Sequence, residues 1–206
     1  MTLAFKTDKI HDMSAANKTR FQKDKMKHVI LYFLEHINNF HLGRTKLMKL
    51  LYYVDFDHFE KYGAPVTGAK YRKFPLGPVP DEADDVIAEM EAKGEVEQIK
   101  AVSVIRGKPA KYVQNRLISK SAKFNPSLFT GAEMEVIERV AKVWEDATAT
   151  AMTEASHKEA PWAGTEDGKM IDYEMAQYRS PLGDEDNVEE ILGKTAAFTK
   201  FVASLE

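Results

Sequence analysis

Residues 45–62 constrain the fold of this chain most, because they are expected to form one helix that is apolar on most of its sides. At intervals of three and four residues, one stripe of this helix is formed by Leu47, Leu50, Leu51, Val54 and His58. A flanking stripe is formed by Met48, Tyr52, Phe56 and Phe59. A helix of this kind has to be surrounded by other elements, so we predict a central, buried helix. Thr45 is expected to cap its start, and Gly63 its end.

Further helices are predicted on both sides of this segment. An apolar stripe with a period of 3.6 residues predicts a helix over 24–38. Pro80 and the acidic residues after it predict the start of a helix over 81–93. Thr130 and Glu133 have the spacing of a capping box and predict another helix start. The remaining helices are expected over 149–157, 172–178 and 185–205.

Strands are predicted in only two places. Residues 96–117 contain β-branched residues on both sides of the turn sequence at 106–109, which predicts a β-hairpin. Residues 63–80 contain three glycines and four prolines, so we expect an ordered loop with one short strand near 70–73.

These elements predict a mainly α fold with a small β-hairpin (α+β), arranged as a compact multi-helix single domain. Residues 1–22 show no sustained period and are expected to form an N-terminal arm, which places the domain at 23–206. The chain has no cysteine, which excludes disulfides and a cysteine nucleophile. No apolar run reaches the ~20 residues of a membrane-spanning helix, and no signal peptide is recognisable. We therefore expect a cytoplasmic protein without a membrane partner.

The net charge of −3 is distributed unevenly. Residues 1–75 carry +7, residues 76–120 carry −1 and residues 121–206 carry −9. A basic first part is compatible with an anionic partner. Its Lys and Arg residues are spread out, however, and do not cluster as in a phosphate-binding stripe. We therefore expect the basic and acidic parts to attract each other within one domain.

No catalytic pattern is present. The sequence lacks a phosphate loop, a dinucleotide fingerprint, a nucleophile elbow and a His-Glu-x-x-His motif. Asp55 and His58 are spaced as two metal ligands, but a buried hydrogen bond from Asp55 to a His or Tyr side chain is the simpler explanation. His157 is either an acid–base group paired with a neighbouring glutamate, or a histidine bonded to a loop carbonyl beside a core Trp162. We favour the structural alternative in both cases and predict no catalytic residue, no metal and no cofactor.

Two features are compatible with nucleic-acid binding. Tyr71, Arg72 and Phe74 can stack on bases and neutralise phosphates, although a solvated strand with an aromatic underside explains them equally well. The order of three helices followed by the hairpin at 96–117 also resembles a winged-helix protein. The candidate recognition helix over 81–93 begins with four carboxylates, which repel phosphates. We therefore do not expect a nucleic-acid partner.

Four segments carry a family resemblance. In chain order they are Lys46 to Tyr52 with Asp55; Gly63, Pro65, Gly68 and Tyr71; Gly77-Pro78-Val79-Pro80; and Ser156-His157 with Pro161-Trp162. Their order and spacing resemble the Panacea domain of SocA-like antitoxins over about residues 25–178. Each motif is short, so the resemblance depends on the ordered set.

The resemblance implies an antitoxin of a type II-like toxin–antitoxin system, which neutralises a cognate protein toxin by direct contact. The SocA-like branch also contains proteolytic adaptors that deliver the toxin to a bacterial protease. This alternative stays open, and so does a homo-oligomer. Some relatives carry an additional N-terminal DNA-binding domain, for which residues 1–22 are too few.

The same resemblance selects candidate residues for partner binding or for the family signature. They are Lys46, Lys49, Tyr52, Asp55, Tyr71, Gly77, Pro78, His157 and Trp162. Lys46 and Lys49 lie off the main apolar stripe of their helix. We therefore expect them at its surface, either solvated or facing acidic groups of a partner. Most of the other residues are expected to maintain the fold.

Overall fold

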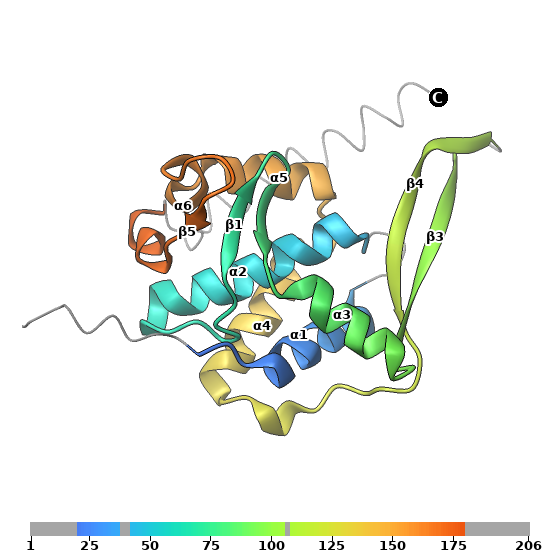
Figure 1. Cartoon of the computed structure of the whole chain (residues 1–206), viewed down its shortest axis with the longest axis horizontal. Helices are drawn as coiled ribbons and strands as arrows, with labels where there is room; N and C mark the ends of the chain where they lie inside the picture. The colour runs from blue at the N-terminus through green and yellow to red at the C-terminus, as the bar shows by residue number, and fades with distance from the viewer. Residues whose placement is uncertain (1–19, 38–41, 106–107, 180–206) are drawn as a thin grey trace, which may run out of the picture.

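The computed structural model describes residues 20–37, 42–105 and 108–179, with the backbone alone for 102–105 and 108–114. Helix α2 (Arg44–Tyr62) is central, and every residue from Lys46 to His58 is buried. Figure 1 shows α2 crossing the middle of the molecule, with α1 (Lys23–His36) and α4 (Gly131–Trp144) below it in the view. The prediction of a central, buried helix is therefore confirmed.

The N-terminal end of α2 differs from the prediction, whereas its C-terminal end agrees with it. Its N-cap is Gly43, without a side-chain cap, so the prediction that Thr45 caps the helix is wrong. The backbone of Gly43 forms a bridge with Arg116 and accepts a hydrogen bond from the Leu47 amide, which fixes the helix start two residues earlier. At the other end, Gly63 has the predicted left-handed conformation, with φ of 72°.

Helix α3 (Ala83–Ala92) begins later than the sequence predicts. Pro80 belongs to a strand and is not the first residue of the helix, because the Asp81 amide and the Glu82 side chain both bond to the backbone of Lys70. The capping box of α4 is confirmed, since Thr130 and Glu133 each accept a hydrogen bond from the backbone of the other.

A three-stranded antiparallel sheet covers one side of α2. Its strands β1 (Tyr71–Phe74), β2 (Gly77–Pro80) and β5 (Met170–Ile171) have the order β2-β1-β5. The predicted short strand is therefore present, whereas the sequence did not reveal β2. Two of its four residues are prolines, which lack an N–H and are tolerated because β2 lies at the edge of the sheet.

The predicted hairpin is a long two-stranded ribbon formed by β3 (Val96–Ile105) and β4 (Lys108–Ser119). Val96 and Leu117 are buried at its base, where the ribbon joins the helical body. Figure 1 shows the other end of the ribbon standing clear of the helices.

Four shorter helical segments complete the described part of the chain. They are the 3-10 helix η1 (Pro126–Leu128), α5 (Ala149–Lys158), α6 (Ala160–Ala163) and the 3-10 helix η2 (Tyr173–Tyr178), which Asp172 caps. The fold is mainly α with small antiparallel sheets, as predicted. The expected helix over 185–205 and most of the expected arm, 1–22, lie outside the described residues. Within the described ranges, no helix is both long and apolar enough to cross a membrane.

Candidate functional site

The side of α2 that faces the small sheet carries three buried polar residues at intervals of three. They are Lys49, Tyr52 and Asp55, all of which are fully buried. Side chains at such intervals lie next to one another on a helix. Each bonds to a different segment, so that together they connect α2 to β2, to the junction of α5 and α6, and to β1.

The β1–β2 hairpin is held by three side chains from three different helices. Each donates a hydrogen bond to a hairpin carbonyl, and the acceptors alternate along the chain: Trp162 Nε1 to Phe74 at 3.1 Å, Thr153 Oγ1 to Leu76 at 3.2 Å, and Lys49 Nζ to Pro78 at 2.9 Å. We call these the three hairpin hydrogen bonds. They fix the turn of the hairpin relative to the helical body.

Gly77 allows Lys49 to approach the hairpin. Its φ is 100°, in the region that favours glycine. A Cβ atom at this position would lie 2.5 Å from Cε of Lys49 and 2.9 Å from Oγ of Ser156. The signature residues Gly77 and Pro78 therefore serve the contact between the hairpin and α2.

The two lysines of the signature are not at the surface. Lys46 and Lys49 each have 0% exposure, so the prediction that they are solvated or face a partner is wrong. Lys46 Nζ donates to the Glu145 carbonyl at 2.7 Å, at the C-terminal end of α4, where a positive charge is favourable. Burial lowers the pKa of Lys49 to about 7 and that of Lys46 to about 8, where nearby Asp146 and Glu145 oppose the shift. Their aliphatic stems pack in the core, which periodicity alone did not indicate.

Asp55 holds the base of the hairpin. Its carboxylate accepts hydrogen bonds from the Thr67 amide at 2.6 Å, from the Thr67 hydroxyl and from the Tyr71 hydroxyl at 2.9 Å. The Tyr173 hydroxyl lies 3.4 Å from the same carboxylate and donates to the Ala69 carbonyl at 2.6 Å. Burial raises the pKa of Asp55, while the hydrogen bonds oppose this shift. The predicted Asp–Tyr hydrogen bond is confirmed. Among the described residues, no group of His, Cys, Asp or Glu is arranged to hold a metal ion.

Arg179 is a buried residue that the sequence did not identify. Its guanidinium donates to Asp57 at 2.7 Å and to Glu159 at 2.8 Å, and Glu159 also accepts from the Tyr52 hydroxyl at 2.7 Å. Glu159 directly precedes α6, so this network positions the helix that carries Trp162. Arg179 and Asp57 are 122 positions apart, and an isolated arginine gives no periodic signal that would connect them.

His157 and Trp162 pack against each other beside the hairpin. Their rings are stacked with centroids 3.7 Å apart, and Nζ of Lys73 lies 4.0 Å from the centre of the Trp162 ring. Trp162 is half-buried and is not the core residue that we expected. Within the described part of the chain, Nε2 of His157 is buried without a hydrogen-bond partner. Burial, with the nearby charges of Lys49 and Lys73, lowers the pKa of His157.

Large apolar side chains are exposed on the outer side of the hairpin. Phe74 is 42% exposed, Leu76 in the turn is 62% exposed, and Met170 on β5 is 42% exposed. Met170 is the cross-strand partner of Arg72, two residues before Phe74, so Met170 and Phe74 share the outer face of the sheet. We call Phe74, Leu76 and Met170 the hairpin patch.

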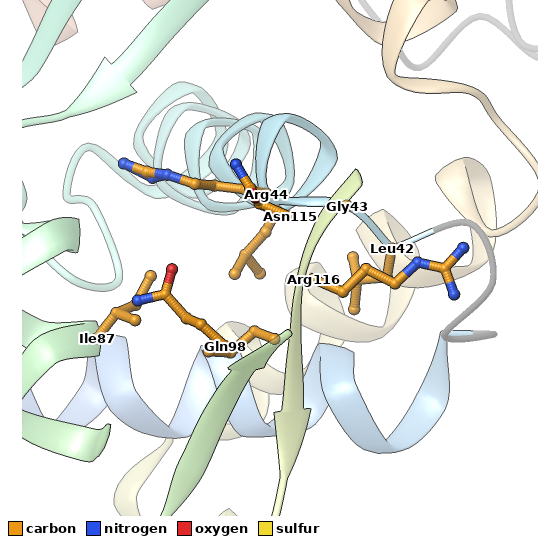
Figure 2. A pocket seen from close by; sticks show the side chains of 9 residues that line it. Leu42, Gly43, Arg44, Ile87, Gln98, Asn115 and Arg116 are labelled. Carbon is orange, nitrogen blue, oxygen red and sulfur yellow. The ribbon is translucent and has the colours of Figure 1, made fainter. Parts of the chain in front are cut away.

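A separate hollow lies between the start of α2 and the base of the ribbon. It is lined by Leu42, Gly43, Arg44, Leu47, Ile87, Gln98, Asn115, Arg116 and Leu117. Figure 2 shows the side chains of Arg44 and Arg116 extending from it in opposite directions. Arg44 forms an ion pair with Asp84. The residues that line the hollow include no carboxylate, histidine or lysine and no nucleophilic side chain, so they offer no catalytic chemistry.

Comparison with known proteins identifies the family. The model of the SocA-like antitoxin Panacea domain matches residues 47–163, more than half of the chain. No curated protein and no solved structure gives a significant match. The matched range extends from α2 to α6 and includes every residue of the three hairpin hydrogen bonds. The chain therefore belongs to the SocA-like Panacea-domain antitoxin family.

Proposed function

We propose that this protein neutralises a protein toxin by binding it directly, as in a type II-like system, with the hairpin patch at the centre of the binding surface. The observation that supports this proposal most is the combination of exposed apolar side chains with a fixed backbone. The side chains of Phe74 and Leu76 are exposed, while their own carbonyls accept two of the three hairpin hydrogen bonds.

A fixed backbone matters because association has to overcome the entropy of ordering the contact residues. When the loop is already ordered, more of the gain from apolar burial remains as affinity. Exposed apolar groups that cluster on one face are also typical of protein-binding sites. Two of the signature residues, Lys49 and Trp162, donate hydrogen bonds to the hairpin, and Gly77 within the hairpin leaves room for Lys49. This gives a family signature a role in binding without direct contact.

The experiment pairs the protein with the product of the adjacent open reading frame. The neighbour is expressed alone and together with this protein, growth is scored, and co-purification is measured. Leu76→Asp is compared with Leu128→Asp, since Leu128 is also an exposed leucine, at 36%, but lies in η1 on the opposite side of α2 from the hairpin in Figure 1. We expect rescue and a stable complex with the wild-type protein and with Leu128→Asp, and loss of both with Leu76→Asp.

Three results would contradict this proposal. Rescue without any complex would exclude sequestration, and a fall in the toxin level that requires a cellular protease would favour the adaptor alternative. Equal loss of binding in both leucine variants, with folding intact, would place the toxin surface elsewhere.

A further inference from the structure

Arg179 is a buried cation outside the range that the family model matches. That range ends at residue 163, whereas Arg179 follows η2. Its side chain is completely buried, and its guanidinium lies 2.7 Å from the Asp57 carboxylate and 2.8 Å from that of Glu159. Buried ion pairs of this kind often add no more stability than apolar side chains of similar volume. Stability alone therefore does not explain why a charged group lies here.

Glu159 transmits the position of the guanidinium to α6. One carboxylate oxygen of Glu159 accepts a hydrogen bond from Arg179, and the other accepts one from the Tyr52 hydroxyl. The backbone carbonyl of the same residue accepts hydrogen bonds from the amides of Trp162 and Ala163, at 3.2 and 2.9 Å. Helix α6 has four residues, too few for a helix that is stable by itself. The contacts of Glu159 therefore determine where α6 lies.

The 3-10 helix η2 packs against α6 as well. The Arg179 amide donates to the Ala176 carbonyl at 3.1 Å, which joins the arginine to η2. Gly164 ends α6, and a Cβ atom at this position would lie 2.7 Å from Cε of Met175 in η2. The glycine therefore allows the two segments to approach closely, so that Arg179, η2 and α6 form one unit.

The same short helix contacts β1. Trp162 Nε1 donates to the Phe74 carbonyl at 3.1 Å, and Nζ of Lys73 lies 4.0 Å from the centre of the Trp162 ring. The same Nζ donates to the Thr165 carbonyl at 2.8 Å, just after α6. Phe74 belongs to the hairpin patch, and Lys73 precedes it in the strand. A shift of α6 would therefore move or release the strand that carries the patch.

We propose that Arg179 is a positioning residue for toxin binding, which acts through Glu159 and Trp162 to keep the hairpin patch in its binding position. This inference rests on the proposed function. The path consists of three hydrogen bonds in series, of which the first ends at Glu159, the second joins Glu159 to Trp162, and the third reaches the Phe74 carbonyl. An arginine that only anchored η2 would leave the hairpin unchanged when its guanidinium is removed.

Loss of the guanidinium is expected to lower the affinity for the toxin although every residue of the hairpin patch is still present. Binding then has to order the hairpin first, which reduces the free energy that remains as affinity. If the hairpin has its binding position in only about a tenth of the molecules, the apparent affinity falls about tenfold.

The experiment compares Arg179→Lys with Arg139→Lys in the full chain. Arg139 in α4 pairs with the same Asp57, at 3.1 Å, so both variants make the same change beside one carboxylate. A third variant, Ile30→Val, lowers global stability at a buried position of α1. Two quantities are measured: hydrogen exchange of the β1 and β2 amides in the free protein, and affinity for the product of the adjacent open reading frame.

We expect Arg179→Lys to accelerate exchange in β1 and β2 at least about fivefold and to weaken toxin binding about tenfold. The lysine keeps the charge but lacks the planar fork that reaches two carboxylates. Arg139→Lys and Ile30→Val are expected to change both quantities less than about twofold. If Arg179→Lys does not fold, Glu159→Gln takes its place, since it removes the negative charge that faces the arginine.

A double-mutant cycle tests the path itself. Trp162→Phe keeps a ring against His157 but removes the donor to the Phe74 carbonyl. Because both changes interrupt the same series of hydrogen bonds, Arg179→Lys in this background is expected to weaken toxin binding less than about threefold further. A full additional loss of about tenfold would overturn the path through Trp162.

The outcomes separate this inference from the proposed function. Unchanged hairpin exchange or unchanged affinity in Arg179→Lys, with toxin binding lost in Leu76→Asp, would overturn the inference and leave the proposed function in place. Equal losses in Arg179→Lys and Ile30→Val would also overturn it, because the arginine would then act through stability alone. Retained toxin binding in Leu76→Asp would contradict the proposed function and, with it, this inference.

Discussion

Arg179 Nη2 donates a hydrogen bond to Glu159 Oε1 at 2.8 Å, and the arginine side chain is completely buried. This contact joins the residue after η2 to the residue before α6. The guanidinium also lies over the rings of Tyr52 and Tyr53, with its carbon 5.7 and 5.6 Å from their centres. The position of α6, and with it that of Trp162 under the hairpin, thus depends on a charged group in the interior.

Removal of this arginine is expected to be strongly destabilising. Arg179→Ala leaves the carboxylates of Asp57 and Glu159 buried without their main partner, which costs about 3–5 kcal/mol of unfolding free energy. Arg139 pairs with the same Asp57, but its side chain is 39% exposed, so Arg139→Ala is expected to cost about 1 kcal/mol or less. Urea denaturation of both variants provides the measurement, and equal losses would contradict the prediction.

Gly77→Ala is expected to disturb the hairpin more than its backbone conformation alone implies. A residue with a Cβ at positive φ costs roughly 1–2 kcal/mol, and Gly94, whose φ is 69°, provides a control that also has a positive φ. Space is open around a Cβ at Gly94, whereas a Cβ at Gly77 meets Lys49 and Ser156. We expect Gly77→Ala to lose about 1 kcal/mol or more beyond Gly94→Ala in thermal or urea unfolding. Similar losses in the two variants would show that the approach of Lys49 is not tight.

The pH dependence of stability is expected to report on Lys49. Burial lowers its pKa from 10.5 to about 7, so between these values the unfolded chain binds a proton that the folded chain does not. Stability therefore rises with pH in this window, with a contribution of at most about 1.4 kcal/mol per pH unit. Lys49→Met removes the titrating group and is expected to show a smaller rise between pH 7 and pH 9. Parallel curves for the two proteins would rule out the buried amine as the cause.

His157 is expected to contribute to the pH dependence of stability below pH 6.5. Burial and the nearby Lys49 and Lys73 lower its pKa below 6.5, so the unfolded chain takes up a proton first as the pH falls. Stability from this group is therefore lost below pH 6.5, toward the folded pKa. His157→Phe keeps a ring against Trp162 without titrating, and we expect it to lose less unfolding free energy between pH 7 and pH 5 than the wild-type protein. A variant that loses more would contradict this assignment.

Much of the fold could be predicted from local patterns. The central helix, the capping box at Thr130 and the ribbon over 96–117 all follow from periodicity or from residues a few positions apart. Errors arose where a distant segment competed with a local preference. The start of α2 is set by a bridge from Gly43 to Arg116, and Pro80 was drawn into a strand by pairing with Tyr71.

The candidate site could be predicted only in part. The signature residues were recognised, but their roles were not, because a lysine at a helix position gives no local indication of whether its amine reaches water or a carbonyl. Lys49 bonds to Pro78, which is 29 positions away, and Arg179 bonds to Glu159, which is 20 positions away. Such hydrogen bonds between segments satisfy buried polar groups, and the periodicity of neither segment indicates which residue the partner is.

Local patterns along the chain were enough to establish that the protein is mainly helical around one buried helix, that it has the ordered motifs of its family, and that it lacks a disulfide. Secondary structure and family motifs depend on residues close together in the chain, which is why they can be recognised from the sequence. Only the fold shows that Lys49, Thr153 and Trp162 converge on one hairpin, and that Arg179 reaches Asp57 and Glu159 in the interior. Both are properties of distance in space, since hydrogen bonds require contact between segments that are far apart in the chain.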